Sequence, residues 1–228
     1  MALRLYFHPL SSYCHKVLIA LYQMAIPFEP HLLNLGDATE RANYLALWPT
    51  GKMPLLLDGE RVVPESSIII EHLARHHATA AQTLLPSDAD AVQEVRLMDR
   101  LFDLYVMTPM QAIVADKLRA EADRDAMAID KARATLAMAY GLLEQRLAGR
   151  EWAAGPQFSM ADCAALPALF YAFTLVPLPA DHPRLAAYFE RLLLQASVAR
   201  TMKEAQPYFN FYPYREAIPA RFMPTAAG

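Results

Sequence analysis

Residues 48–70, WPTGKMPLLLDGERVVPESSIII, carry the pattern that decides the fold. A Pro- and Gly-containing turn precedes two short apolar runs, residues 55–57 and 61–63, and the Asp-Gly pair between these runs is typical of a tight turn. Two serines follow the second run and can cap the strongly apolar helix that begins after them. The spacing therefore predicts a β-hairpin followed directly by a helix.

The residues before this stretch predict the rest of a small sheet. Residues 3–7 form a short apolar run, residues 14–22 show helical spacing of apolar side chains, and residues 28–33 fit a second strand. Polar residues 36–43 then lead into a short helical or irregular stretch. The predicted order is strand, helix, strand, helix, strand, strand, helix, which combines one parallel βαβ unit with an antiparallel hairpin and places helices on the sheet faces.

The chain changes character after about residue 86. Two long periodic segments, residues 90–118 and 125–147, predict helices, and the Ser159 to Asp162 spacing predicts a capping box at the start of another. Prolines interrupt the apolar run 163–180, so it predicts a buried helix ending near Pro177 and no membrane span. We therefore predict an α/β domain over residues 1–80 and an all-helical domain over residues 88–228. The proline- and aromatic-rich tail, residues 207–224, is expected to pack on the body of the protein.

Composition excludes several classes of protein. With 55% hydrophobic and 20% charged residues, the 228-residue chain is globular, and a net charge of −3 provides no basic stripe for nucleic acid. Two cysteines cannot form a disulfide scaffold, and the first ten residues do not resemble a secretion signal, so a cytoplasmic location is expected. No His, Cys and Asp residues share metal-ligand spacing, so no metal is expected.

The tetrapeptide 11–14, Ser-Ser-Tyr-Cys, lies between a predicted strand and the start of a helix. Unpaired amides and the helix dipole favour an anion there, and a bound thiol would lose its proton more easily. Ser11 or Ser12 could donate a hydrogen bond to that thiolate or could simply cap the helix. Cys14 could form a mixed disulfide, but its spacing to the apolar residues favours a small buried side chain. His15 is interpreted as a surface residue.

Four motifs together resemble the cytosolic glutathione S-transferases. They are SSYCHKVLIAL at 11–21, WPTGKMPLL at 48–56, VPESSIIIEHL at 63–73 and FSMADCAALPAL at 158–169. The resemblance is to serine-type, bacterial-like members with some zeta-like features. It implies a thioredoxin-like glutathione-binding domain followed by an all-helical bundle domain, with glutathione as co-substrate.

The resemblance also implies roles for individual residues. Ser11 would face the sulfur of glutathione, and Met53 would pair its backbone with the cysteinyl part because the following proline is cis. Lys52 would meet the glycine carboxylate or remain a solvated lysine. The implied glutathione-binding set is Ser11, Lys52, Met53, Pro54, Glu65 and Ser66, of which the last two would hold the γ-glutamyl end. For the electrophile pocket, the candidates are Leu10, Tyr105 and Met110.

The expected function is that of a glutathione S-transferase, which would activate glutathione as a thiolate for attack on a small apolar electrophile in detoxification. Two alternatives stay open. One is a glutathione-dependent isomerase of the maleylacetoacetate type, although His15 and Lys16 stand where those enzymes usually have an aromatic residue and Arg. The other is a non-catalytic, protein-binding dimer that uses the aromatic residues 208–214. The family also implies a homodimer, formed through the helix containing residues 71–75 and the first long helix of the second domain.

Overall fold

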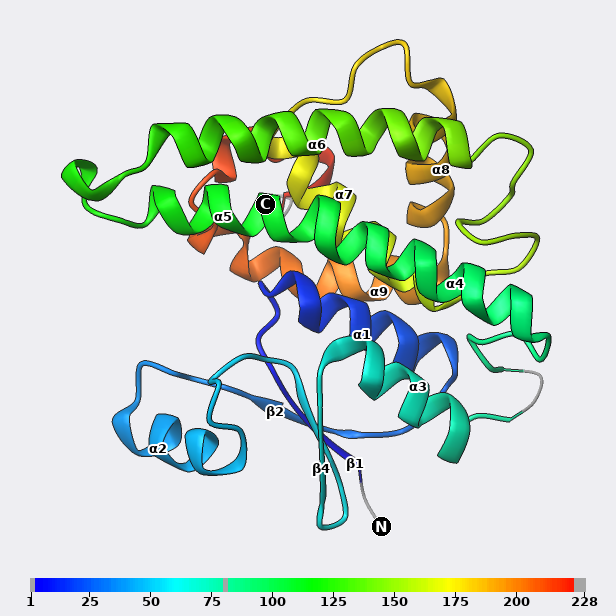
Figure 1. The fold of residues 1–228 in the computed structure, drawn as a ribbon. Coiled ribbons are helices and arrows are strands. Elements are labelled where there is room, and N and C mark those ends of the chain that lie inside the picture. The colour runs from blue at the N-terminus through cyan, green and yellow to red at the C-terminus, as the bar shows by residue number, and fades with distance from the viewer. Residues whose placement is uncertain (1–2, 80–81, 224–228) are drawn as a thin grey trace, which may run out of the picture.

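The structure is a computed structural model that describes residues 3–79 and 82–223. A small sheet with its helices lies below a bundle of longer helices (Figure 1). The strands are β1 (Leu3–Phe7), β2 (Glu29–Leu32), β3 (Leu55–Asp58) and β4 (Arg61–Pro64). The helices of the sheet domain are α1 (Ser12–Gln23), α2 (Ala38–Leu47) and α3 (Ser66–His76). Those of the bundle are α4 (Ala89–Leu101), α5 (Thr108–Lys117), α6 (Ala126–Arg146), α7 (Met160–Leu175), α8 (Pro183–Leu193) and α9 (Ala196–Ala205).

The sheet has the strand order β2-β1-β3-β4. Strand β1 pairs parallel with β2 and antiparallel with β3, and β3 pairs antiparallel with β4. Asp58 lies opposite Arg61 at the hairpin turn, where Gly59 adopts φ +61°, a conformation that glycine adopts without steric cost. The order of elements predicted for the first domain, including the hairpin, is confirmed.

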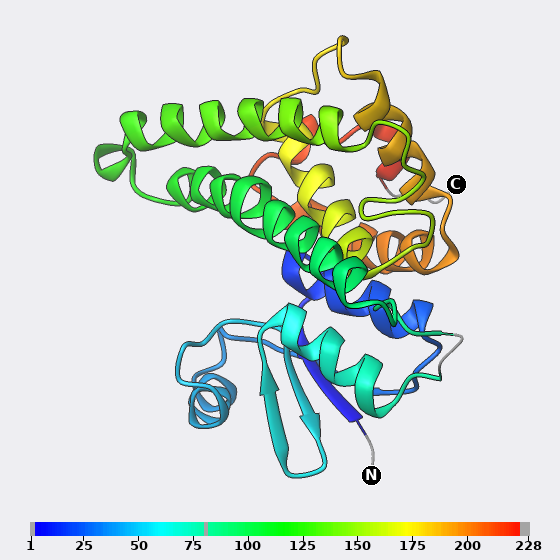
Figure 2. The ribbon, with the colours of Figure 1, turned by 45° about the vertical axis from the view of Figure 1, so that its right-hand side comes forward.

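Side chains alternate between the two faces of the sheet, as a pleated strand requires. Leu5, Leu56 and Val63 belong to the large core that α1 and α3 share with the helical bundle. Their neighbours Tyr6 and Leu55 belong to a second, smaller core with Tyr44 and Leu47 of α2. Helices α1 and α3 therefore cover one face, and α2 covers the other. Figure 2 shows α1 between the sheet and the bundle.

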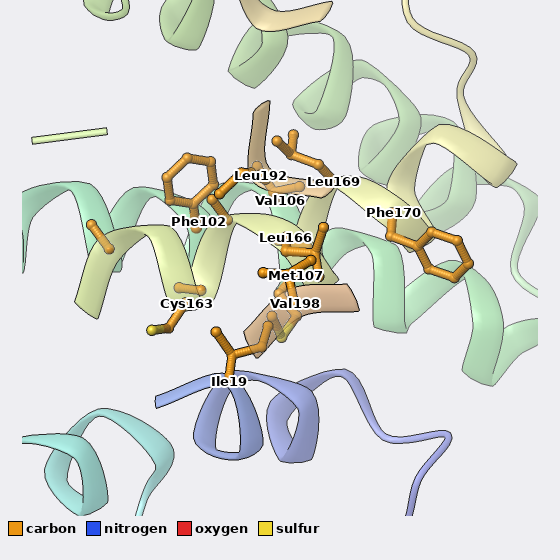
Figure 3. Packing of buried hydrophobic residues seen from close by; sticks show 14 of the residues in the cluster. Ile19, Phe102, Val106, Met107, Cys163, Leu166, Leu169, Phe170, Leu192 and Val198 are labelled. Atoms are coloured by element: carbon orange, nitrogen blue, oxygen red, sulfur yellow. The ribbon is translucent and has the colours of Figure 1, made fainter. Parts of the chain in front are cut away.

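Helix α7 is the centre of the bundle and is apolar on all sides. Ser159 and Asp162 form the predicted capping box, and the helix ends at Leu175, two residues before Pro177. In Figure 3, Cys163, Leu166 and other α7 residues pack above Ile19 of α1, so one continuous core joins the two domains. The prediction of a buried core helix is confirmed. Among the described residues, no helix combines the length and the apolar character that a bilayer crossing requires.

The predicted helix over residues 90–118 contains a π-helical segment, η1 (Phe102–Met107), between α4 and α5. Pro109 has no N–H and its ring clashes with the carbonyl four residues earlier, so an α-helical ladder cannot continue through it. The Thr108 amide instead reaches back to the Asp103 carbonyl, and the Thr108 hydroxyl donates to the same oxygen at 2.9 Å. The wider turn lies beside the cavity described below.

The C-terminal tail packs on α7 through short 3₁₀ helices, η3 (Gln206–Phe211), η4 (Arg215–Ala217) and η5 (Ala220–Phe222). Phe209 stacks on Phe170 with ring centroids 5.4 Å apart, and the Tyr212 hydroxyl lies 2.8 Å from Thr174 Oγ1. The prediction that the tail packs on the body is confirmed for the described residues. Pro224 and the predicted domain end at residue 80 lie outside them, and the exact domain ranges stay a prediction.

Candidate functional site

A cavity of about 880 Å³ lies between the sheet domain and the first helices of the bundle. It brings together the starts of α1 and α3, the segment before β3, and the α4–η1–α5 helix. All six residues predicted to bind glutathione line it: Ser11, Lys52, Met53, Pro54, Glu65 and Ser66.

Ser11 is the N-cap of α1. Its Oγ accepts a hydrogen bond from the Cys14 amide at 3.4 Å, and its hydroxyl proton stays available for a group in the cavity. Ser12 is buried and its Oγ accepts from Gln111 Nε2 at 3.3 Å. Cys14 is fully buried, and burial raises the pKa of its thiol to about 12. Of these three side chains, Ser11 is the one that lines the cavity.

His15 lies in the interior, so its interpretation as a surface residue is wrong. It is fully buried, and its Nε2 donates to the Pro9 carbonyl at 2.5 Å. Burial lowers the pKa of the imidazole to about 4, so the ring is neutral near pH 7. The Tyr171 hydroxyl, from α7, donates to the Leu10 carbonyl at 2.9 Å. Together the two contacts fix the backbone of the turn that precedes Ser11.

The segment before β3 is held by backbone geometry. Gly51 adopts φ +66°, and a Cβ there would lie 3.2 Å from Leu45 Cδ2, so any other residue would be strained at this position. The Gly51 amide donates to the Trp48 carbonyl at 3.0 Å, which closes the turn with tryptophan at its first position. The Tyr44 hydroxyl donates to the Lys52 carbonyl at 2.6 Å. The Met53-Pro54 peptide is cis, as the resemblance implied, and Met53 lines the cavity just before the β3 ladder begins.

Helix α3 starts in the cavity without a side-chain cap. Its N-cap residue, Glu65, adopts φ +67° and ψ 119°, a backbone conformation that costs a non-glycine residue about 1–3 kcal/mol. The Glu65 carbonyl accepts from the Ile69 amide at 2.8 Å, and no side chain bonds to the amides of the first turn in the described part of the chain. Such amides and the positive end of the helix dipole form an anion-binding site.

A buried group of charges lies directly behind this helix start, and the sequence analysis missed it. Lys16 Nζ lies 2.6 Å from Asp99 Oδ1, 2.8 Å from Asp103 Oδ2 and 2.9 Å from Ser67 Oγ. Arg100 lies 2.8 Å from Asp99 Oδ2 and 2.7 Å from Asp103 Oδ2, and also contacts Ser67 Oγ. All of these residues except Lys16 line the cavity.

This charge network joins α1, α3, α4 and η1, so it crosses between the two domains. Burial raises the pKa of the Asp103 carboxyl in spite of the Lys16 ammonium beside it. Lys16 occurs within an apolar helical run, and a charged residue at a core position was the signal that could have identified the network.

The bundle side of the cavity differs from the predicted electrophile pocket. Leu104, Thr108 and Gln111 line it at helical spacing. Tyr13 of α1 lines the cavity from the sheet domain, and burial raises the pKa of its hydroxyl to about 12. The predicted residues Leu10, Tyr105 and Met110 are not in the lining: Met110 is buried in the core and Tyr105 is 43% exposed.

Comparisons with known proteins identify the family. Residues 5–81 match the model of the glutathione S-transferase N-terminal domain, and residues 98–195 match that of the C-terminal domain. Glutathione S-transferase 3 of Zea mays is 32% identical over 88% of this chain and 93% of its own length.

Two solved bacterial structures are also similar. The glutathione S-transferase of Methylobacillus flagellatus, with glutathione bound, is 26% identical with a TM-score of 0.80, over 88% of this chain and 98% of that one. The enzyme of Methylobacterium radiotolerans, in complex with glutathione sulfonate, is 29% identical with a TM-score of 0.75, over 88% and 94% of the two chains. With a thioredoxin-like domain, a helical domain and matches across both, this chain belongs to the glutathione S-transferase family.

Proposed function

We propose that this chain is a serine-type glutathione S-transferase. It binds glutathione in the cavity and activates the thiol as a thiolate for attack on a small electrophile. The observation that carries the proposal is Ser11, a hydroxyl at the N-terminus of α1 that lines the cavity and has its proton available. A helix N-terminus lowers the pKa of a nearby thiol, and the hydroxyl adds a charge-assisted hydrogen bond to the thiolate.

The remaining contacts place the tripeptide along the cavity. The open amides of α3, with Glu65 and Ser66, receive the γ-glutamyl end, where the carboxylate benefits from the helix dipole. The Met53 backbone pairs with the cysteinyl unit, and the Lys52 ammonium receives the glycine carboxylate. Relatives whose structures hold glutathione or glutathione sulfonate support this assignment.

The electrophile occupies the space between Tyr13, Leu104 and the polar pair Thr108 and Gln111. The thiolate attacks the electrophilic carbon, a sulfur–carbon bond forms, and the leaving group departs with the bonding electron pair. Both apolar and hydrogen-bonding groups surround this space, so its ligands are small molecules with an apolar body and a polar group.

Replacement of Ser11 by alanine tests the proposal. We expect Ser11→Ala to lower kcat by about 100-fold and to raise the pKa of bound glutathione, with its Kd changed only a few-fold. Thiolate absorbance across pH and steady-state kinetics with a panel of electrophiles and isomerisable substrates measure both quantities. Ser12→Ala is the matched control, because Ser12 is buried, and it should lower kcat far less. Unchanged kcat and thiol pKa in Ser11→Ala would remove Ser11 from the mechanism, and no heat on glutathione titration would favour a non-catalytic protein.

We also propose that the chain forms a homodimer through α3 and α4. Large apolar side chains of these two helices are exposed, Ile68 at 54% and Leu97 at 39%. Sedimentation velocity should give a dimer, and Leu97→Asp, which is outside the cavity lining, should shift it toward monomer. A wild-type monomer at micromolar concentration would contradict this.

A further inference from the structure

Helix α3 ends in a group of three side chains that the proposed function does not use. They are Asp58, the last residue of β3, His72 near the end of α3, and His77, which caps it. We infer that these residues form a binding site for a divalent transition-metal ion, and that the ion is zinc.

The three ligand atoms converge on one point. His72 Nε2 lies 2.8 Å and His77 Nε2 lies 2.7 Å from the same carboxylate oxygen, Asp58 Oδ2. One ligand atom from each residue lies within 4.8 Å of the others. In a tetrahedral zinc site with bonds near 2.0–2.1 Å, neighbouring ligand atoms are about 3.3 Å apart. Each nitrogen must therefore move about half an ångström away from Asp58 Oδ2, and the two nitrogens, which lie within 4.8 Å of each other, must adopt the same spacing.

The site combines rigidity with access. The His72 side chain is only 5% exposed and lies on a packed helix, so it is fixed in place. The His77 and Asp58 side chains are 26% and 19% exposed, which gives an ion a path from solvent. Both imidazoles keep their hydrogen bonds to Asp58 Oδ2 when no ion is bound.

The donor set selects the type of ion. Two imidazole nitrogens and one carboxylate oxygen suit zinc, whereas calcium and magnesium prefer oxygen ligands alone. Three protein ligands leave the fourth tetrahedral position for water. The C-terminal end of a helix favours a cation through its dipole. Arg61, opposite Asp58 in the hairpin, and Arg75 in the last turn of α3 oppose binding through their positive charge.

The site is separate from the cavity. None of its three residues lines the cavity, and His72 and His77 lie about 9 Å and 16 Å along the helix from Ser66 at 1.5 Å per residue. A bound ion would tie the β3–β4 turn to the end of α3, which makes its effect a structural one. Zinc should therefore raise the melting temperature of the protein.

Isothermal titration of the untagged full chain with zinc chloride, without glutathione, tests the inference. We expect one ion per chain and a rise in melting temperature, and both His77→Ala and Asp58→Asn should weaken binding by at least about tenfold. His31→Gln is the matched control: His31 pairs with a single carboxylate, Glu40, at 3.1 Å, and its loss should leave zinc affinity unchanged.

Two results would overturn the inference: no zinc bound at millimolar concentration, or equal zinc affinity in the wild type and in folded His77→Ala or Asp58→Asn. The nearly isosteric Asp58→Asn change keeps the test decisive if His77→Ala does not fold. Cobalt gives a second readout, because tetrahedral coordination by the wild type should produce a visible absorption band that both variants lose.

Discussion

The two ends of α3 present opposite chemistry. At its start, the amides of the first turn have no side-chain cap, Glu65 is held in a costly backbone conformation, and the proposed anion is the γ-glutamyl carboxylate. At its end, Arg75 and His76 occupy the last turn, and Asp58 accepts hydrogen bonds from His72 and His77. One helix dipole favours an anion at the first end and a cation at the second.

The ends also differ in how their charges are held. Behind the start of α3, Lys16, Asp99 and Asp103 are almost completely buried. At the other end, Asp58 and His77 are partly exposed. Buried charges depend strictly on their partners, whereas partly exposed charges can exchange a partner for water or an ion. The first end should therefore contribute more to stability, and the second should respond more to solution conditions.

Removing the buried ammonium should have the largest effect on stability. We expect Lys16→Met to lower the free energy of unfolding by about 3–5 kcal/mol, because it leaves two buried carboxylates with Arg100 as their remaining cation. Denaturant unfolding measures the loss. The control is Arg4→Gln, which breaks an exposed pair with Glu29 and should lower the free energy of unfolding far less than Lys16→Met does. Similar losses in the two variants would contradict the contrast between buried and exposed charges.

An intermediate effect on stability is expected at the C-terminal end of α3. Asp58→Asn should lower the free energy of unfolding by about 1–2 kcal/mol near pH 7, because it weakens two hydrogen bonds. The folded-state pKa of Asp58 is lowered, so its stabilisation is complete above the ordinary carboxyl pKa and is lost as pH falls through the lowered value. The difference in the free energy of unfolding between wild type and variant should thus narrow in acid, as measured by denaturant unfolding from pH 7 to about pH 2. If this difference in the free energy of unfolding did not change with pH, the ionised Asp58 carboxylate would not be the source of the stabilisation.

The smallest expected effect on stability is an increase in the free energy of unfolding. Glu65→Gly relieves the φ +67° conformation and should stabilise the fold by about 1 kcal/mol, while it weakens glutathione binding. Ala25→Gly is the matched control, because Ala25 also adopts a positive φ, +53°, but lies outside the cavity lining. It should stabilise without any change in the Kd for glutathione. Calorimetric titration and thermal melts of both variants provide the comparison, and equal glutathione affinity in Glu65→Gly would show that the strained residue has no part in binding.

Much of the first domain follows from local patterns. The hairpin at 55–64 was predictable because its turn residues and apolar runs are adjacent in the sequence, and the Ser159 capping box spans only four residues. Local patterns were less informative where distant residues decide the environment. His15 was assigned to the surface because the sequence does not show that α7 packs against α1 and buries it.

The sequence by itself determined the order of elements, the two-part organisation, the buried α7 and the motifs that resemble glutathione transferases, because each depends on residues close together in the chain. Only the tertiary structure decided the charge network of Lys16 with Asp99 and Asp103, the lining by Thr108 and Gln111, and the convergence of Asp58 with His72 and His77. Those contacts join residues 14 to 99 positions apart. Such pairings depend on how the helices pack against one another, and no local pattern encodes that packing.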